Sequence, residues 1–417
     1  MKRSYVAIGI LLAFGLSSCD NEVDVVYPSF GSGSILPQTT PISSATRGAM
    51  EGVYAVRAGG DQFGQSVVLQ WNGDYLSVYT GTHAGYFIMQ GGRLDSALYF
   101  EGYWRYAVST QTGLLRLTIE SDTGGKYLLG DSTASSQIVL GGAYGNNDGL
   151  PTTALALEYV RPIRTEILSQ KFWVLAHRGG GRNSEYLGVS ENSLDMISLA
   201  ERFGADGIEI DVKVSTDGEP FLYHDKDVNL RLIQKSVFWG PIENFSFPQL
   251  RTLLRLANGE RIPTLDEALE FVLDKTTLSF VWLDLKSDKN EIPLVIPIQQ
   301  KYLDLARQRG RDLEIVLGLP TEDKVDNLAA IPNHENAPSL CELELDLVRK
   351  VNSRVWAPRW TQGLQTSDVR AMQAEGRRAF VWTLDVDRYI STFVTDGEFD
   401  GILTNYPTLV AYYHYVR

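Results

Sequence analysis

The chain has 417 residues, of which 44% are hydrophobic, and a formal net charge of −13 at pH 7. This length exceeds one ordinary domain of about 100 to 200 residues, so we expect two domains. An acidic chain without a lysine- or arginine-rich run is poorly suited to a phosphate backbone, which excludes nucleic acid as an expected partner. A small anionic substrate would need a local cation or lysine.

The first residues have the pattern of a secretory signal. Lys2 and Arg3 precede an apolar stretch from Tyr5 to Leu16 that is too short to be a stable membrane span. It ends in Leu-Ser-Ser-Cys19, which resembles the bacterial lipobox, where the cysteine is lipidated and becomes the mature N-terminus. We expect residues 1–18 to be a lipoprotein signal peptide and Cys19 to be the membrane anchor, with simple cleavage and secretion as the alternative.

The expected location is the cell envelope of a Gram-negative bacterium, with the protein lipid-anchored on the periplasmic or outer-membrane surface. Asp20, Glu22 and Asp24 resemble the export signal of surface lipoproteins in the Bacteroidetes. Residues 19–46 are rich in Ser, Gly, Pro and Thr without sustained periodicity, which predicts a flexible tether.

Residues 47–165 predict an all-β domain of unknown role, either a sandwich or a small barrel. Short apolar or alternating runs are separated by turn residues, and Asn72-Gly73-Asp74 predicts a hairpin with a primed turn. The many aromatic residues favour core and cross-strand packing, and a face that binds a carbohydrate or protein ligand is the alternative. The predicted strands are 67–71, 75–79, 86–90, 98–106, 114–119, 137–144 and 154–159.

Residues 166–417 change to a rhythm of strand, loop and helix. Ser193 can cap a helix that ends at Gly204. Eight predicted strands fit an α/β fold, a (β/α)8 TIM barrel whose reacting groups lie at the C-terminal strand ends, and a doubly wound sheet is the competing architecture. The predicted strands are 173–176, 207–212, 220–223, 279–285, 314–317, 354–357, 379–383 and 401–403.

Charged and imidazole side chains gather at the expected strand ends. Glu209, Asp211 and Lys213 share one face of a strand because alternate side chains point the same way. His177 and His224 each follow an apolar run. Two imidazoles and a carboxylate pair at successive strand ends indicate metal-assisted acid/base chemistry.

From Trp173 to the C-terminus the chain resembles the glycerophosphodiester phosphodiesterase family. The resemblance implies a TIM barrel that hydrolyses glycerophosphodiesters to sn-glycerol 3-phosphate and an alcohol, with a divalent metal ion and two histidines. It says nothing about positions 20 to 165. The matching pieces are His177-Arg-Gly-Gly, Glu191-Asn-Ser, Glu209-Ile-Asp-Val, Asp217-Gly, His224-Asp, Ile262-Pro-Thr-Leu-Asp-Glu-Ala-Leu, Asp284-Leu-Lys and Asp400-Gly-Ile-Leu-Thr-Asn-Tyr-Pro.

The resemblance implies a role for each matching position. His177 and His224 would be the catalytic histidines, and the metal-binding carboxylates would be Glu209, Asp211 and Asp284. The residues that contact substrate would be Arg178, Lys286 and Trp382. Glu191 and Asn192 would form a polar pair near the first histidine.

Four positions depart from the family's pattern: Asp284, Asn405, and Ser190 and Ser193, which replace a proline and a threonine beside Glu191-Asn192. Asp284 stands where glutamate is usual, which shortens one ligand, and Ca²⁺ and Mg²⁺ both remain candidates for an oxygen-ligand site. Asn405 stands where aspartate is common, and we expect this to affect loop shape more than proton chemistry. The segment from Asp225 to Arg261 occupies the family's insertion, where apolar side chains could line the alcohol side or pack on the barrel.

Two alternative functions stay open. A phospholipase-D-like enzyme could use the same histidines on lysophospholipids or sphingolipids. A surface binding protein could instead carry its function in the β-rich domain and have a catalytically idle barrel. The sequence also leaves open whether water attacks phosphorus directly or a cyclic phosphate forms first.

Overall fold

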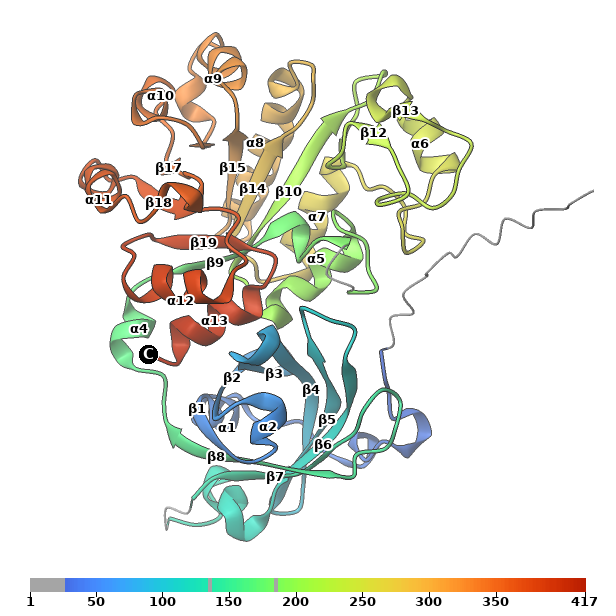
Figure 1. Cartoon of the computed structure of the whole chain (residues 1–417), viewed down its shortest axis with the longest axis vertical. Helices are drawn as coiled ribbons and strands as arrows, with labels where there is room; N and C mark the ends of the chain where they lie inside the picture. The colour runs from blue at the N-terminus through green and yellow to red at the C-terminus, as the bar shows by residue number, and fades with distance from the viewer. Residues whose placement is uncertain (1–26, 134–136, 184–186) are drawn as a thin grey trace, which may run out of the picture.

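The computed structural model describes residues 27–133, 137–183 and 187–417, which form two barrels that lie one above the other in Figure 1. The predicted signal peptide and Cys19 lie outside the described residues. Within these ranges, no helix combines the length and the apolar character that crossing a membrane requires.

The N-terminal domain is a closed antiparallel barrel of eight strands. Each strand pairs with the next, and β1 closes the ring by pairing with β8. The small-barrel prediction is therefore confirmed and the sandwich is wrong, because β1, which the sequence pattern did not predict, supplies the closing edge. The strands are β1 Gly52–Ala58, β2 Ser66–Asn72, β3 Tyr75–Thr80, β4 Gly85–Leu94, β5 Ala97–Tyr106, β6 Thr112–Ile119, β7 Val139–Tyr144 and β8 Thr153–Arg161.

The aromatic residues of this barrel mostly pack inside it or against the second domain. Tyr54, Tyr79, Tyr86 and Trp104 are all at most 1% exposed. Phe63, from the short helix α2 (Gly60–Phe63), meets Trp104 edge-to-face with ring centroids 5.4 Å apart. Burial of these large rings accounts for much of the domain's aromatic content.

The chain before the barrel is packed where the sequence predicted a flexible tether. Two short turns, η1 (Gly31–Gly33) and η2 (Leu36–Gln38), precede helix α1 (Ser44–Met50). Ser34 Oγ donates to Glu101 Oε2 at 2.6 Å, and Thr40 and Arg93 exchange backbone hydrogen bonds at 2.8 Å. These bonds and the burial of Ile42 hold residues 27–46 against β4 and β5.

The second domain is a closed barrel of eight parallel strands, so the (β/α)8 prediction is confirmed and the doubly wound sheet is wrong. Strand β9 pairs with both β10 and β19, which closes the ring. A helix follows every barrel strand. The strands are β9 Trp173–Ala176, β10 Gly207–Val214, β14 Phe280–Leu285, β15 Glu314–Leu319, β16 Ser339–Cys341, β17 Val355–Trp356, β18 Arg378–Val381 and β19 Gly401–Thr404, and the helices are α5 Leu194–Ala200, α7 Leu265–Lys275, α8 Ile292–Gln308, α9 Glu322–Ala329, α10 Leu345–Lys350, α11 Thr366–Ala374, α12 Asp387–Thr395 and α13 Pro407–Tyr415.

One of the eight predicted barrel strands is wrong. The run predicted at 220–223 forms β11 (Pro220–Leu222), which pairs antiparallel with β10 as a hairpin. A parallel crossover needs a dozen or more residues, whereas the turn here contains Gly218 at φ 87° and returns the chain at once. The missing barrel strand is the three-residue β16, so β14, which carries Asp284, is the third barrel strand rather than the fourth.

An insertion separates β11 from α7. It contains β12 (Asp227–Val228), β13 (Gly240–Pro241), η8 (Ile242–Asn244) and α6 (Phe247–Leu253). Leu232 and Ile233 are buried in a small apolar core that the insertion forms with β11, and not on the barrel itself as the packing alternative expected. Val237 and Trp239 are 89% and 84% exposed, so the insertion also presents apolar side chains to solvent.

One hydrophobic cluster includes buried residues of both barrels. Helix α13 and the turn after α5 pack on β2, β3 and β4. The Tyr86 and Phe203 rings meet with centroids 5.1 Å apart, and Ser77 Oγ donates to the Arg202 carbonyl at 2.8 Å. The β barrel therefore rests against elements that flank β9 and β19, where the parallel barrel closes.

Candidate active site

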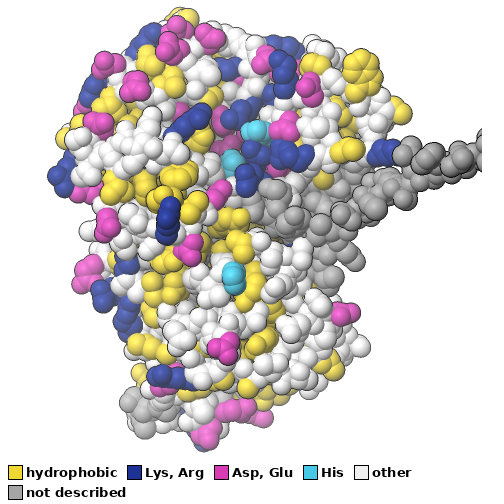
Figure 2. Space-filling model, viewed as in Figure 1, with side chains coloured by type: hydrophobic (Ala, Val, Ile, Leu, Met, Phe, Trp, Pro, Cys, Tyr) yellow, Lys and Arg dark blue, Asp and Glu magenta, His cyan; other side chains and the backbone are white. Residues whose placement is uncertain are grey.

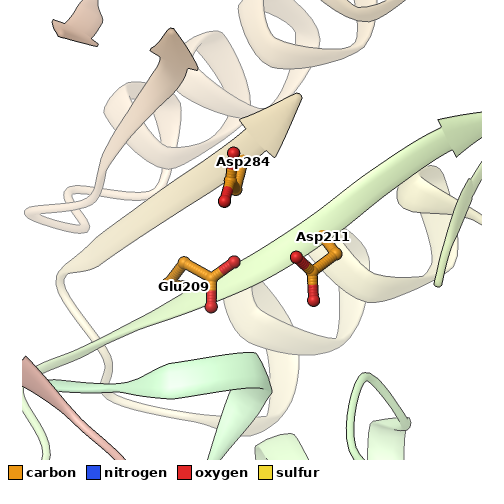
Figure 3. A group of neighbouring side chains, drawn as sticks. All are labelled: Glu209, Asp211 and Asp284. Atoms are coloured by element: carbon orange, nitrogen blue, oxygen red, sulfur yellow. The ribbon is translucent and has the colours of Figure 1, made fainter. Parts of the chain in front are cut away.

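Strand β10 presents its acidic residues to the barrel interior and its apolar residues to the surrounding helices. Ile208, Ile210 and Val212 pack in the layer between strands and helices. Asp211 lies directly beside Asp284 of β14 in the parallel register. Alternation along β10 therefore brings Glu209 and Asp211 to the same place as Asp284 (Figure 3).

These three carboxylates form a candidate metal site. One ligand oxygen from each lies within 4.8 Å of the others, and all three residues are buried. Glu209 Oε1, Asp211 Oδ1 and Asp284 Oδ1 are each without a hydrogen-bond partner. Buried polar atoms are rarely left unpartnered, so three such oxygens facing one another fit a hard, oxygen-binding cation such as Ca²⁺ or Mg²⁺.

Electrostatics distinguish the three carboxylates. Burial, and then the charges of Asp211 and Asp284, raise the pKa of Glu209 well above its usual value. Burial also acts to raise the pKa of Asp211, but the nearby charges of His224, Lys286 and Arg178 outweigh it and lower that pKa. Burial raises the pKa of Asp284 against the effect of Lys286. A bound cation would remove the repulsion that burial makes costly.

The loop after β9 fixes two of these carboxylates in place. Arg178 adopts a left-handed backbone at φ 54°, and its N–H donates to Glu209 Oε2 at 2.8 Å. Asn192, also left-handed at φ 57°, donates from Nδ2 to Asp211 Oδ2 at 2.7 Å and accepts from the Asp211 N–H at 3.0 Å. The polar pair predicted near the first histidine thus includes a direct support of a carboxylate.

His177 is held by a neutral amide. Its Nδ1 lies 2.8 Å from Asn405 Oδ1, while Asn405 Nδ2 donates to Asp385 Oδ2 at 2.6 Å. Because the amide nitrogen is turned to the Asp385 carboxylate, its oxygen accepts from a protonated Nδ1 of His177. The neutral ring then has no proton on Nε2, which lies 3.7 Å from Glu209 Oε2. Burial, and then the Arg178 charge, lower the pKa of His177 to about 3.

His224 is held by a carboxylate. Its Nδ1 lies 2.7 Å from Asp225 Oδ1, and the ring is more exposed than that of His177. Burial acts to raise the pKa of Asp225, but hydrogen bonds from Arg231, His224 and Asn229 lower it well below its usual value. The two imidazoles therefore have partners of different charge.

Both histidines open on one cavity of about 300 Å³. Figure 2 shows histidine, basic and acidic side chains gathered at one place on the surface of the parallel barrel. Lys286 and Trp382 line the cavity as predicted, and Lys286 Nζ lies 2.5 Å from Asp284 Oδ2. Arg178 also lines it, although its Nη1 is already bonded to Glu191 at 2.8 Å.

The roles of Glu342 and Asn405 at the site were not predicted from the sequence. Glu342, directly after β16, is half-buried at the cavity, and its buried Oε1 has no hydrogen-bond partner among the described residues. Burial, and then the Asp284 charge, raise the pKa of Glu342 well above its usual value. It was missed because β16 itself was missed. Asn405 was noticed only as a departure affecting loop shape, whereas it contacts His177 directly.

Comparison with known proteins agrees with this geometry. Residues 177–324 match the sequence pattern of the Glycerophosphoryl diester phosphodiesterase family. This stretch is a domain of that family. It contains both histidines and all three carboxylates of the site.

Named relatives differ in how much of their own length matches this chain. A glycerophosphodiester phosphodiesterase of Caldanaerobacter subterraneus is 25% identical over 57% of this chain and 95% of its own. Mouse glycerophosphodiester phosphodiesterase 1 is 38% identical over 23% of this chain and 28% of its own. A solved glycerophosphodiester phosphodiesterase of Parabacteroides distasonis has 22% identity and a TM-score of 0.46, covering 57% of this chain and 94% of its own.

Chelation of divalent ions should lower the melting temperature of the protein, measured by differential scanning calorimetry with Ca²⁺ and then with EDTA. Without an ion, the raised pKa of Glu209 means that stability falls as pH rises through that pKa. We therefore expect a larger difference in melting temperature between the two conditions at pH 8 than at pH 5. When Ca²⁺ is present at 100 times its Kd, its binding adds about 2.7 kcal/mol to the free energy of unfolding.

Two variants test where the ion binds. Asp284→Asn should abolish the Ca²⁺-dependent shift, whereas Asp312→Asn, at an exposed position before β15, should retain it. An equal shift in both variants would contradict the assignment.

Proposed function

We propose that this protein is a phosphoric diester hydrolase that cleaves glycerophosphodiesters to sn-glycerol 3-phosphate and an alcohol, using a divalent metal ion and two histidines. The observation that carries the proposal is the meeting, in one cavity, of two imidazoles with three buried carboxylates whose facing oxygens lack partners. The family match over residues 177–324 supports it independently.

The cavity is suited to a phosphate group. A divalent ion at the three carboxylates would neutralise non-bridging phosphate oxygens and stabilise the charge that develops on them. Burial acts to lower the pKa of Lys286, but Asp284 and Asp211 outweigh it and raise that pKa, so its ammonium stays charged. Lys286 and Arg178, which lie beside these carboxylates, can thus help to bind and orient the anionic group.

The different partners of the histidines assign them different proton roles. His177 is neutral because of its lowered pKa, and its free Nε2 can take a proton from the attacking hydroxyl or water. His224, paired with the negatively charged Asp225, can hold a proton and give it to the leaving alcohol oxygen. Trp382, held by a hydrogen bond from Nε1 to the Ala357 carbonyl at 2.8 Å, would border the alcohol.

A second substrate class has one observation in its favour. Val237 and Trp239 on the insertion are largely exposed, and the loop that holds them begins next to His224. Apolar side chains on this insertion would suit lysophospholipids, whose glycerol carries an acyl chain. A catalytically idle barrel is disfavoured because both histidines and the carboxylates are present and face one another.

The protein should hydrolyse glycerophosphocholine in the presence of Ca²⁺ or Mg²⁺, with EDTA abolishing turnover. Glycerol 3-phosphate and free choline are measured together, and glycerophosphoethanolamine and lysophosphatidylcholine are compared as substrates. His177→Ala and His224→Ala should each lower kcat by about 10²- to 10⁴-fold, as expected for loss of one proton-transfer group. Both variants should still bind the ion.

The outcomes separate the functions. Release of choline from lysophosphatidylcholine alone would move the assignment to the phospholipase-D-like enzyme. Absence of release from all three substrates with either ion would contradict an enzymatic role.

Exchanging the two residues behind His177 should shift its proton affinity. In the double variant Asn405→Asp, Asp385→Asn the hydrogen bond between the two side chains is kept, but the carboxylate now faces Nδ1. A facing carboxylate stabilises the imidazolium and raises the His177 pKa by about 1 to 3 units. The acid limb of the pH profile of kcat/KM should move upward, and an unchanged profile would argue against His177 as the base.

We also propose that the protein is anchored in the bacterial cell envelope through acylated Cys19, as residues 1–19 suggest. Labelling of growing cells with an alkyne-tagged fatty acid should tag the wild-type protein and leave Cys19→Ala untagged. The Ala variant should also leave the membrane fraction. Equal labelling of Cys341→Ala and wild type is the control.

A further inference from the structure

Arg231 joins two carboxylates that come from different parts of the active site. It lies in the loop between β12 and β13, which begins just after His224. Its Nε and Nη2 donate to the two oxygens of Asp225, at 3.1 Å and 2.6 Å. Its Nη1 donates to Glu191 Oε2 at 2.8 Å. One guanidinium thus uses both of its edges.

Each of these carboxylates holds a group that faces the reaction. Asp225 Oδ1 lies 2.7 Å from His224 Nδ1, and Glu191 Oε1 accepts from Arg178 Nη1 at 2.8 Å. The chain of contacts therefore runs from His224 to Arg178 with Arg231 at its centre. Two positive guanidinium groups alternate with two carboxylates along it, so every buried charge has an opposite neighbour.

We propose that Arg231 is a positioning residue that holds the His224 imidazole and the Arg178 guanidinium in one fixed relation. The proposal rests on the proposed hydrolysis, since it concerns the same cavity. According to this proposal, the positions of His224 and Arg178 depend on how the insertion loop packs against the barrel.

The loop around Arg231 is built to hold it still. The next two residues, Leu232 and Ile233, are buried, and the Arg231 carbonyl accepts from Asn183 Nδ2 at 2.6 Å. Gln234 N–H donates to the Arg255 carbonyl at 3.0 Å. With the backbone fixed, little conformational freedom remains to be lost when the side chain makes its three hydrogen bonds.

The arrangement requires arginine rather than a positive charge alone. A planar guanidinium can donate two hydrogen bonds to Asp225 from one edge and a third to Glu191 from another nitrogen. A lysine ammonium is a single point of charge without this fixed geometry. Without Arg231, Glu191, which is 1% exposed, would keep on Oε2, among the hydrogen bonds of the described residues, the Asn183 N–H at 3.0 Å. The Glu191 carboxylate would then compete for Arg178 and draw it from its position.

Arg231→Lys tests the geometry while keeping the charge. We expect kcat for glycerophosphocholine to fall on the order of 100-fold, the effect of a misplacement of about 1 Å. KM should change by less than about threefold, because the displaced groups act mainly in the transition state. Lys235→Met, an exposed lysine of the same loop, is the matched control and should keep wild-type kcat.

Two further measurements separate positioning from general damage. Arg231 contacts none of the three carboxylates of the metal site, so Ca²⁺ affinity measured by isothermal titration calorimetry should be unchanged in Arg231→Lys. The double variant Arg231→Lys, Asp225→Asn should lose little more activity than the worse single variant, since both changes break the same support of His224.

A spectroscopic readout does not depend on turnover. The Nδ1 proton that His224 shares with Asp225 should give a downfield imidazole signal in proton NMR spectra, identified by its loss in His224→Ala. It should weaken or vanish in Arg231→Lys.

The proposal is overturned if Arg231→Lys keeps both this signal and kcat within about threefold of wild type, or if its Ca²⁺ affinity falls in parallel with kcat. It is likewise overturned if the fold-loss of kcat in the double variant equals the product of the fold-losses in Arg231→Lys and Asp225→Asn. A wild-type protein without hydrolytic activity would refute the proposed function instead, and the NMR comparison would still decide the role of Arg231.

Discussion

Three carboxylates buried side by side at the mouth of the parallel barrel are the constraint on which the rest of the site depends. Their facing oxygens lie within 4.8 Å of one another, where two full charges repel by about 3 kcal/mol at an effective dielectric constant near 20. Such a cluster persists only if neighbours and a cation offset that repulsion. Arg178 and Asn192 tie down the outer oxygens, and Lys286 contacts Asp284, so the inner oxygens are left for an ion.

The same strand ends also separate the two imidazoles chemically. His177 is buried against an amide, and His224 is paired with a carboxylate that is itself held by a guanidinium. Burial lowers the pKa of His177 to about 3, whereas His224 has a carboxylate as its partner, so one fold holds two imidazoles in different electrostatic surroundings. Asn405 and Asp225 cause this difference between the two imidazoles, although neither is one of the three carboxylates of the proposed metal site.

In the part of the chain that the structure describes, the N-terminal barrel contacts helices that lie behind the site. Thr408 Oγ1 of α13 donates to the Ala84 carbonyl at 3.2 Å, and Ser66 Oγ lies 2.9 Å from Tyr412 Oη. Helix α13 directly follows the loop that carries Asn405, and α5 follows the loop that carries Asn192. Because both helices lie in the core shared by the two barrels, the β barrel buttresses the segments behind His177 and Asp211.

The sequence alone determined the parts of this protein that depend on local pattern. Period-two alternation placed Glu209 and Asp211 on one face of a strand, and the strand-and-helix rhythm predicted the parallel barrel. Tertiary structure decided what depends on distant partners: the closing strand β1, the place of the three-residue β16 in the ring and hence the site residue Glu342, and the hairpin formed by β11. It also decided which partner each histidine receives, because Asn405 lies 228 positions from His177 and only barrel closure brings them together.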